Sequence, residues 1–380
     1  MLANLMPIGS VVFSDMWAYW LLFLLPVGMI LSPFKIDRNI NYLVWAIFGL
    51  LAVLLIGLRY EIGVDWAGYL IYLDQARIRQ DDIAAVIMVG NANGLAYMLL
   101  NWTVIKLGLG IYVVNLVSAA ILIIGLMKYC QKQPIPWLAL AVAMPYTIGV
   151  VAMAYTRQAV ALGLLFWGLA ILREGKEGKY FSLVMLGTLF HISAIVNLPY
   201  MVLARKRILW YYYLFFGLFI GGVLVLLNSL GYLSLYISVV LYTLELSSAG
   251  GAVRAYMNVV PVLASLFFLQ RIKSISPDWK IIKWMALAAF ASIALLSVSS
   301  TMVDRFALYL IPLQVALWPR LVSVQQTMLM RSILASMILS YYCLILYVWF
   351  HYAAHAPWWL PYSMWPFHSE PLFVPRLLPM

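Results

Sequence analysis

The sequence predicts an all-α, polytopic integral membrane protein with about 10 to 12 transmembrane segments. Composition is the first reason, because 66% of the 380 residues are hydrophobic and only 10% are charged, whereas a soluble domain carries about 25% charged residues. The second reason is that apolar runs of roughly 17 to 25 residues, long enough to cross a bilayer as helices, recur along the chain. No linker or internal repeat divides residues 1–380, so we expect a single transmembrane domain.

The expected spans are apolar runs bounded by polar or charged residues. The first is not typical of a cleavable signal peptide, because no basic region precedes it and no small-residue cleavage site follows it. We expect spans at residues 16–33, 40–58, 110–127, 136–153, 157–172, 208–228, 254–270, 281–299, 305–320 and 331–350.

The basic residues predict the orientation of these spans. Sixteen of the 24 Lys and Arg fall in short connections: Lys35, Arg38, Lys128, Lys132, Arg173, Lys176, Lys179, Arg205, Lys206, Arg207, Arg271, Lys273, Lys280, Lys283, Arg320 and Arg331. Because cytoplasmic loops collect positive charge, we place these connections in the cytoplasm and both termini outside. The net charge of +11 then reflects insertion topology and anionic lipid headgroups, and we expect no nucleic-acid partner.

Three segments need special treatment in this topology. Residues 59–109 form an extracytoplasmic loop followed by an interfacial or re-entrant helix at 94–108. Residues 180–203 lie between two cytoplasmic points and are too short to cross twice, so we expect a re-entrant hairpin of two half-helices that meet near His191. Residues 229–253 form a second outer loop that ends in a flexible Ser/Gly hinge at 247–251.

Four arginines lie at the outer ends of apolar segments, against the charge rule that orients the chain. They are Arg59, Arg157, Arg254 and Arg305. A planar guanidinium suits bidentate binding of phosphate oxygens better than an ammonium does. We read the last three as lying at helix starts, where the dipole is already positive and anions bind. The pattern predicts that the four side chains converge on one outer anion site, although a single Arg can also extend to lipid headgroups.

Carboxylates and aromatic residues accompany these arginines. Asp65, Trp66 and Tyr69 follow Arg59 and offer a carboxylate that can orient a substrate and rings that can stack on sugars. An ordinary interfacial loop with an aromatic belt is the alternative. Asp304, just before Arg305, is well placed as a helix N-cap, and that structural role alone would explain it.

His191 lies within the hydrophobic run of the expected hairpin. Ionisable residues at membrane depth are rare and usually functional, and histidine titrates near neutrality. A hydrogen bond to a carbonyl at the hairpin break is the structural alternative. No metal-ligand spacing is visible in the sequence, so we expect neither a metal nor another cofactor.

These residues resemble the EpsG/Wzy-type polysaccharide polymerases of bacterial inner membranes. The family pattern, an Arg followed by Val-Gly-Thr-Asp-Tyr and then a Tyr, is similar to Arg59, Ile62-Gly63-Val64-Asp65-Trp66 and Tyr69, with Val64 and Trp66 as departures. No acidic-Pro element precedes the expected half-helix. The later matches, in order over residues 40–320, are Leu107-Gly108, Met127-Lys128-Tyr129, Arg157-Gln158-Ala159, Leu189-Phe190-His191-Ile192-Ser193-Ala194 with Pro199, and Arg305 with Tyr309.

The resemblance implies a membrane glycosyltransferase of the GT-C kind in the bacterial inner membrane, with its active site facing the periplasm. It implies transfer of a glycan from undecaprenyl diphosphate to the terminal sugar of another lipid-linked repeat unit. The expected partners are the lipid-linked donor and acceptor, membrane lipid, and a chain-length-regulating co-polymerase as a further candidate.

The expected roles follow from this reaction. The four outer arginines stabilise the departing diphosphate in place of a metal. His191 is the acceptor-side catalytic group and Asp65 orients the attacking sugar, with the reverse assignment open. Sugar-binding or orienting roles are expected for Gln158, Tyr69, Trp66, Asp304 and Tyr309.

Three other functions remain as alternatives. An O-antigen ligase uses the same donor chemistry with a different acceptor. A membrane O-acyltransferase also uses a membrane histidine, but it needs an acyl-donor site for which the sequence offers no feature. A transporter of an anionic lipid-linked glycan typically has internal repeats and charges at the bilayer midplane, whereas the arginines here gather at one predicted face.

Overall fold

The computed structural model describes residues 12–33, 37–205 and 248–367, together with single positions between 214 and 225. Within these ranges every regular element is a helix. Six helical runs are long and apolar enough to cross a membrane: Arg38–Gly57, Ile111–Cys130, Gly250–Ser274, Trp279–Ser297, Ser300–Ser323 and Met328–Tyr352. The predicted all-α, polytopic membrane fold is therefore confirmed.

Other expected spans form shorter apolar helices. Residues 16–33 give α1 (Trp17–Leu31), residues 136–153 give α7 (Pro136–Ala143) running into the π-helix η2 (Met144–Ala152), and residues 157–172 give α8 (Thr156–Leu172). The expected span at 208–228 lies outside the described ranges, as does most of the expected loop 229–253.

The long runs contain the following elements. They are α2 (Arg38–Gly57), α6 (Ile111–Cys130), α13 (Ala249–Ser265), η4 (Leu266–Phe268), α14 (Leu269–Ser274), α15 (Trp279–Ala294), η5 (Leu295–Ser297), α16 (Ser300–Ala307), η6 (Leu308–Leu310), α17 (Ile311–Ser323) and α18 (Met328–Tyr352), and two short 3-10 turns, η1 (Phe13–Asp15) and η7 (Ala356–Trp358), flank the first and last helices.

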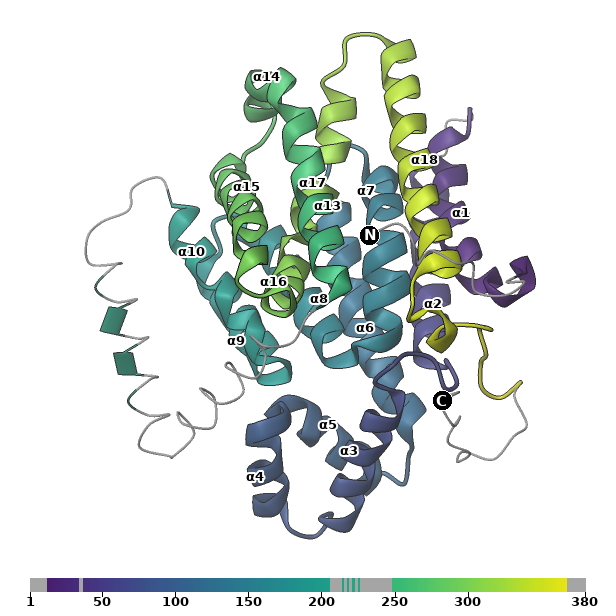
Figure 1. The fold of residues 1–380 in the computed structure, drawn as a ribbon, viewed down its shortest axis with the longest axis vertical. Helices are drawn as coiled ribbons and strands as arrows, with labels where there is room; N and C mark the ends of the chain where they lie inside the picture. The colour runs from purple at the N-terminus through teal and green to yellow at the C-terminus, as the bar shows by residue number, and fades with distance from the viewer. Residues whose placement is uncertain are drawn as a thin grey trace.

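The helices run alternately up and down between two chemically different ends of the bundle. One end, called the basic end, carries ion pairs such as Lys132–Glu174 at 2.8 Å and Arg320–Asp278 at 2.8 Å. The other, called the site end, carries Asp65, Arg157 and Arg305. Figure 1 shows α14 and the α17–α18 connection at the basic end, and α3, α4 and α5 beyond the site end.

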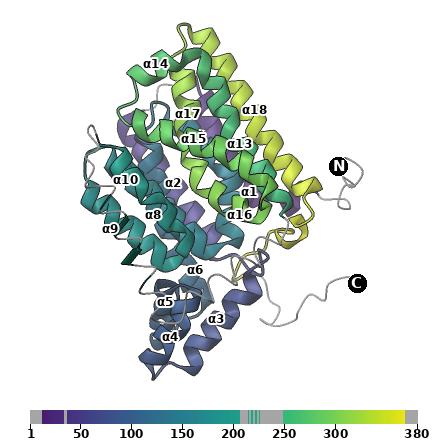
Figure 2. The same ribbon diagram turned by 60° about the vertical axis from the view of Figure 1, so that its left-hand side comes forward.

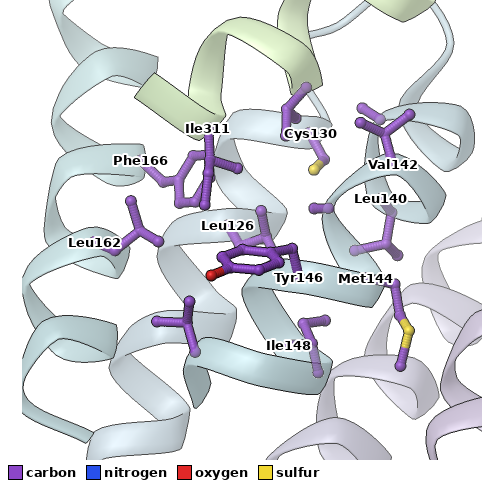
Figure 3. Close-up of a cluster of buried hydrophobic side chains, with 14 of the residues drawn as sticks. Leu126, Cys130, Leu140, Val142, Met144, Tyr146, Ile148, Leu162, Phe166 and Ile311 are labelled. Carbon is purple, nitrogen blue, oxygen red and sulfur yellow. The ribbon is translucent and has the colours of Figure 1, made fainter. Parts of the chain in front are cut away.

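The core is built around α8, which packs against α6 on one side and α9 on the other. Leu126, Leu162 and Phe166 interlock there with Ile311 of α17 (Figure 3). Tyr146 of η2 lies in the same cluster. This packing fixes the first turn of α8, which carries Arg157, as a rigid part of the site end.

Residues 59–93, expected as an outer loop, contain two helices. They are α3 (Trp66–Ile78) and α4 (Ile83–Asn93), and with α5 (Leu95–Lys106) they form a three-helix module beyond the bundle (Figures 1 and 2). Trp66, Tyr69 and Tyr97 belong to a second apolar cluster that packs these helices against α6, α8 and α9. The charged residues that suggested a loop lie mainly on the exposed faces of the module.

Residues 177–203 form a pair of antiparallel helical arms. The first arm is α9 (Glu177–Phe190), and the second is η3 (Ile192–Asn197) followed by α10 (Pro199–Leu203). His191 occupies the turn between the arms at the site end, while Arg205 and Glu177 form an ion pair at 3.3 Å at the basic end. The position of this hairpin relative to a bilayer stays a prediction.

Candidate functional site

Four charged or titratable side chains from separate segments gather at the site end. Asp65 precedes α3, Arg157 lies in the first turn of α8, His191 lies in the hairpin turn, and Arg305 lies in α16. Asp65 and His191 each interact electrostatically with both Arg157 and Arg305. These four residues are called the charged cluster below.

Arg157 is fixed by the turn that joins η2 to α8. Tyr155 precedes α8, and Arg157 is the second residue of the helix, as the sequence predicted. Its guanidinium carbon lies 5.0 Å from the centre of the Tyr72 ring, a cation–π contact that orients the side chain. The Tyr69 hydroxyl contacts the Arg157 main chain. Arg157 is half-buried and remains accessible to an anion approaching the helix start.

Burial and the neighbouring arginines shift the pKa of the Asp65 carboxyl in opposite directions. Partial burial raises the pKa of the Asp65 carboxyl, while Arg157 and Arg305 pull it down. Burial is the larger effect, because removing a carboxylate from water disfavours its charged form. A partly buried carboxylate that interacts with two guanidinium groups is suited to accept a hydrogen bond from a substrate hydroxyl.

His191 is held by a chain of hydroxyl groups. Its Nδ1 lies 2.6 Å from the Ser193 hydroxyl, which lies 2.9 Å from the Tyr309 hydroxyl. Both hydroxyls can donate or accept, so the chain can fix either tautomer of the ring. With Nδ1–H donating to Ser193, Nε2 is left as the proton acceptor. Among the described residues, the hydrogen-bond partner of the His191 ring is the Ser193 hydroxyl.

The surroundings of His191 favour its neutral form. Burial, followed by Arg157 and then Arg305, lowers the pKa of the imidazole to about 3. The residue lies in the turn between two helices, outside the candidate spanning helices. The expectation that burial would keep His191 uncharged agrees with this direction of shift.

The hairpin turn is located by the three-helix module. Gly94 joins α4 to α5 with φ +98°, and a Cβ atom there would lie 2.5 Å from the main-chain oxygen of Phe190. The absence of a side chain at Gly94 therefore lets the module touch the residue before His191. Asp65 and His191 are thus attached to two elements in direct contact.

Arg254 forms an ion pair with Asp304 instead of lying free at a helix start. Its Nη1 lies 2.7 Å from Asp304 Oδ1 and donates to the main-chain oxygen of Asp304 at 3.1 Å. The guanidinium also lies 5.0 Å from the Tyr146 ring centre. Asp304 interacts with Arg305 as well, so this pair borders the charged cluster.

Several expectations about these helix starts were wrong. Ser299, not Asp304, caps α16 by accepting from Met302 N–H at 3.2 Å, and Arg305 lies in the last turn of α16. The expected Ser/Gly hinge is mostly helix, since α13 begins at Ala249. Gly251 lets α13 pack closely on Ser300. This contact between helices holds Gly251 in the helix despite the conformational freedom of glycine.

Arg59 lies beneath the site and does not line it. It is 1% exposed, and its terminal nitrogens donate to the Ile56 oxygen at 2.7 Å and to Thr156 Oγ1 at 2.8 Å. The expectation that four equivalent arginines converge on one cavity therefore fails for Arg59. Its side chain instead links the end of α2 to the first residue of α8, next to Arg157.

The aromatic residues expected to bind or orient sugars are buried. Trp66 is 7% exposed, Tyr69 3% and Tyr309 2%, so no ring face of these residues is open to a sugar. Gln158 is also buried, within α8. Trp66 and Tyr69 support the three-helix module, and Tyr309 acts through Ser193 on His191.

Two residues at the site had no expected role from the sequence. Ser193 contacts His191 because the 3-10 turn after His191 brings residues two apart together. Tyr72 lies one turn after Tyr69 on α3 and meets Arg157. The helical spacing from Tyr69 would have indicated Tyr72 only if residues 66–78 had been recognised as a helix.

The fold and the site define a multi-pass helical membrane protein whose arginines, an aspartate and a histidine gather at one end of the bundle. The family model of the EpsG family matches residues 42–364. The chain belongs to the EpsG family, which is associated with glycosyltransferase-like polysaccharide polymerases. This confirms the resemblance carried by the ordered motifs. No curated protein and no solved structure matches the chain.

Proposed function

We propose that this protein polymerises a polysaccharide by moving a glycan from undecaprenyl diphosphate to the terminal sugar of another lipid-linked repeat unit. We further propose that the reaction occurs at the periplasmic face of a bacterial inner membrane. The observation that carries the proposal is the charged cluster, in which Asp65 and His191 share Arg157 and Arg305. Family membership supports the polymerase class.

Arg157 and Arg305 would hold the diphosphate. Cleavage of the glycosyl–phosphate bond leaves negative charge on the departing diphosphate, and preorganised cations stabilise that charge most effectively in a site that excludes water. Arg157 lies at a helix N-terminus, whose dipole adds to its own charge. Arg305 is exposed in the last turn of α16, where a diphosphate can reach its guanidinium.

Arg254 would act through its pairing with Asp304. A diphosphate at Arg157 and Arg305 lies near this pair, because Asp304 interacts with Arg305. The Asp304 carboxylate keeps Arg254 oriented at the edge of the site. In this arrangement Asp304 offsets much of the charge of Arg254, so Arg254 would shape the edge of the site while Arg157 and Arg305 supply the direct contacts.

His191 would accept the proton of the attacking hydroxyl at Nε2. Its low pKa makes it a weak base in the empty site, because Arg157 and Arg305 add to the effect of burial. Binding of an anionic diphosphate neutralises both arginines and raises the basicity of the imidazole. The base would therefore become effective when the donor is bound. Asp65 would align the acceptor sugar by accepting a second hydroxyl hydrogen bond.

The test is polymerisation from purified undecaprenyl-diphosphate-linked repeat units by the detergent-solubilised protein. Replacement His191→Ala should abolish most turnover while binding of undecaprenyl diphosphate persists. His355→Ala is the matched control, since His355 is exposed beyond α18. Lack of polymer with the native protein, together with transfer to a lipid A core acceptor, would favour a ligase and contradict the polymerase assignment.

A further inference from the structure

The segment that precedes Asp65 is paired along its length with residues near the end of the described chain. Leu58 O accepts from Trp365 N–H at 2.8 Å, Tyr60 N–H donates to Ser363 O at 3.0 Å, and Gly63 N–H donates to Trp358 O at 2.8 Å. Arg59 and Met364 face each other in an antiparallel bridge. Residues 358–365 are called the C-terminal strap below.

The strap is itself anchored to α1 and α2 at the site end of the bundle. Trp359 is fully buried, and its oxygen accepts from the Tyr19 hydroxyl at 3.0 Å. Tyr362 N–H donates to Asp15 O at 2.8 Å, and the Tyr362 hydroxyl donates to Leu55 O at 2.6 Å. These bonds join the strap to two helices more than 300 positions away in sequence, so it is a fixed part of the fold.

The opposite side of the paired segment contacts the turn that carries Arg157. Gly63 has φ +99°, and a Cβ atom there would lie 2.6 Å from Ala154 Cα and 2.6 Å from Met153 O. Asp65 follows two residues later. Residues 58–63 are therefore held between the strap on one side and the η2–α8 turn on the other.

We propose that the C-terminal strap is a positioning element of the site, which sets Asp65 against Arg157 and so controls use of the acceptor sugar. The inference rests on the proposed function. A misplacement of about 1 Å in a catalytic arrangement can cost on the order of 10²-fold in rate. Three main-chain hydrogen bonds and a close glycine contact are the kind of support that holds a loop within that tolerance.

The strap would affect the acceptor more than the donor. Arg157 and Arg305 are carried by α8 and α16, which belong to the helical bundle, so the diphosphate contacts should depend on the strap less than Asp65 does. Asp65 depends on it, because only one residue, Val64, separates Asp65 from Gly63. Loosening the strap should therefore lower turnover and raise the KM for the acceptor, while donor binding stays intact.

Replacement Tyr362→Phe tests the strap with little change in packing. It removes the hydroxyl that bonds Leu55 O and keeps the ring, which packs at 5.7 Å from the Tyr19 ring. Tyr347→Phe on the exposed side of α18 is the matched control. We expect at least a ~10-fold loss of kcat/KM for the acceptor in Tyr362→Phe, with undecaprenyl diphosphate binding within about twofold of native and a similar Tm.

A second pair of variants approaches the same segment from its other side. Gly63→Ala should push residues 58–63 away from the η2–α8 turn, whereas Gly68→Ala in α3 meets open space. Tyr362→Phe and Gly63→Ala, the two variants that move the segment, should also shift the acid limb of kcat/KM to lower pH. Burial is the main cause of the raised pKa of the Asp65 carboxyl. If Asp65 moves into water, that pKa should fall toward the ordinary Asp value.

The possible outcomes distinguish failure of the strap proposal from failure of the proposed function. Native protein that forms no polymer overturns both. Native activity with a Tyr362→Phe enzyme of unchanged acceptor kcat/KM and unchanged acid limb overturns the strap alone. Losses that follow only the folded fraction, with donor and acceptor affected equally, also overturn it, because they show a stabilising role without positioning.

Discussion

At the residue scale, burial separates arginines that look alike in the sequence. Arg59 and Arg157 each follow an apolar run, but Arg59 is enclosed and hydrogen-bonded to Ile56 and Thr156, whereas Arg157 is half-open. A guanidinium whose terminal nitrogens already donate to protein atoms has little capacity left for a phosphate. Arg59 therefore supports the helix start that presents Arg157.

Because of this difference, replacement by lysine should lower turnover at Arg157 and Arg305 but lower stability at Arg59. Arg157→Lys and Arg305→Lys should lose on the order of 10²-fold in turnover with unchanged Tm, because an ammonium cannot form the bidentate contact. Arg59→Lys should lower Tm, because Thr156 and the Ile56 carbonyl lose a buried donor, at about 1–3 kcal/mol each. Thermal unfolding and polymerisation assays on the three variants check this, and equal Tm losses in all three would contradict it.

Protonation of Asp65 should cause the fall in kcat/KM on the acid side of the pH profile. The pKa of its carboxyl is raised by burial, so kcat/KM should fall as pH drops through a value above the ordinary Asp range. The pKa of His191 is lowered by burial, Arg157 and Arg305, so His191 should add no limb near pH 6 to 7 to kcat/KM for the donor, which reports the protein without bound donor. Asp65→Asn should remove the acid limb, while Asp74→Asn on the exposed face of α3 should keep it. An acid limb near the ordinary His pKa that disappears in His191→Gln would refute the assignment.

At the element scale, the three-helix module and the hairpin meet through one glycine. Gly94 allows the α4–α5 corner to touch Phe190, directly before His191. Neither element was expected to contact the other, since the first was read as a loop and interfacial helix and the second as a separate hairpin. Their contact makes the position of His191 depend on the module that carries Asp65.

Alanine at this corner should damage activity through geometry. Gly94→Ala places a Cβ atom 2.5 Å from Phe190 O, while Gly108→Ala has the same kind of positive φ but meets nothing within 4 Å. Both variants carry the conformational cost of positive φ, so their difference isolates the contact. We expect Gly94→Ala to lose at least ~10-fold more turnover than Gly108→Ala. Equal turnover after normalising for folded protein would show that the contact does not position His191.

At the scale of the whole molecule, the alternation of helices leaves the two ends chemically distinct. Basic residues and their ion pairs lie at one end, and the charged cluster, the module and the strap lie at the other. The ion pair between Glu177 and Arg205 joins the two ends of the hairpin at the basic end. Insertion by the positive-inside rule would put the basic end in the cytoplasm.

Cysteine labelling tests this orientation. In a background without Cys130 and Cys343, single cysteines at residues 179 and 205 should both be blocked by a membrane-impermeant thiol reagent only after the cells are permeabilised. A cysteine at residue 81, in the α3–α4 connection, should react in intact spheroplasts. Labelling of residues 179 and 205 from opposite sides would exclude the hairpin topology.

The sequence alone determined the membrane fold, most span positions, the family through its ordered motifs, and the places of Arg157 and His191. These depend on hydropathy, charge and short spacings, which are local properties of the chain. The tertiary structure decided that Arg59 is a buried support, that Arg254 pairs with Asp304, and that Trp66 and Tyr69 are core residues. It also joined Leu58 to Trp365 and Arg59 to Thr156, which lie far apart in sequence. Burial and partner choice depend on which distant segments meet, and no local pattern in one sequence encodes that.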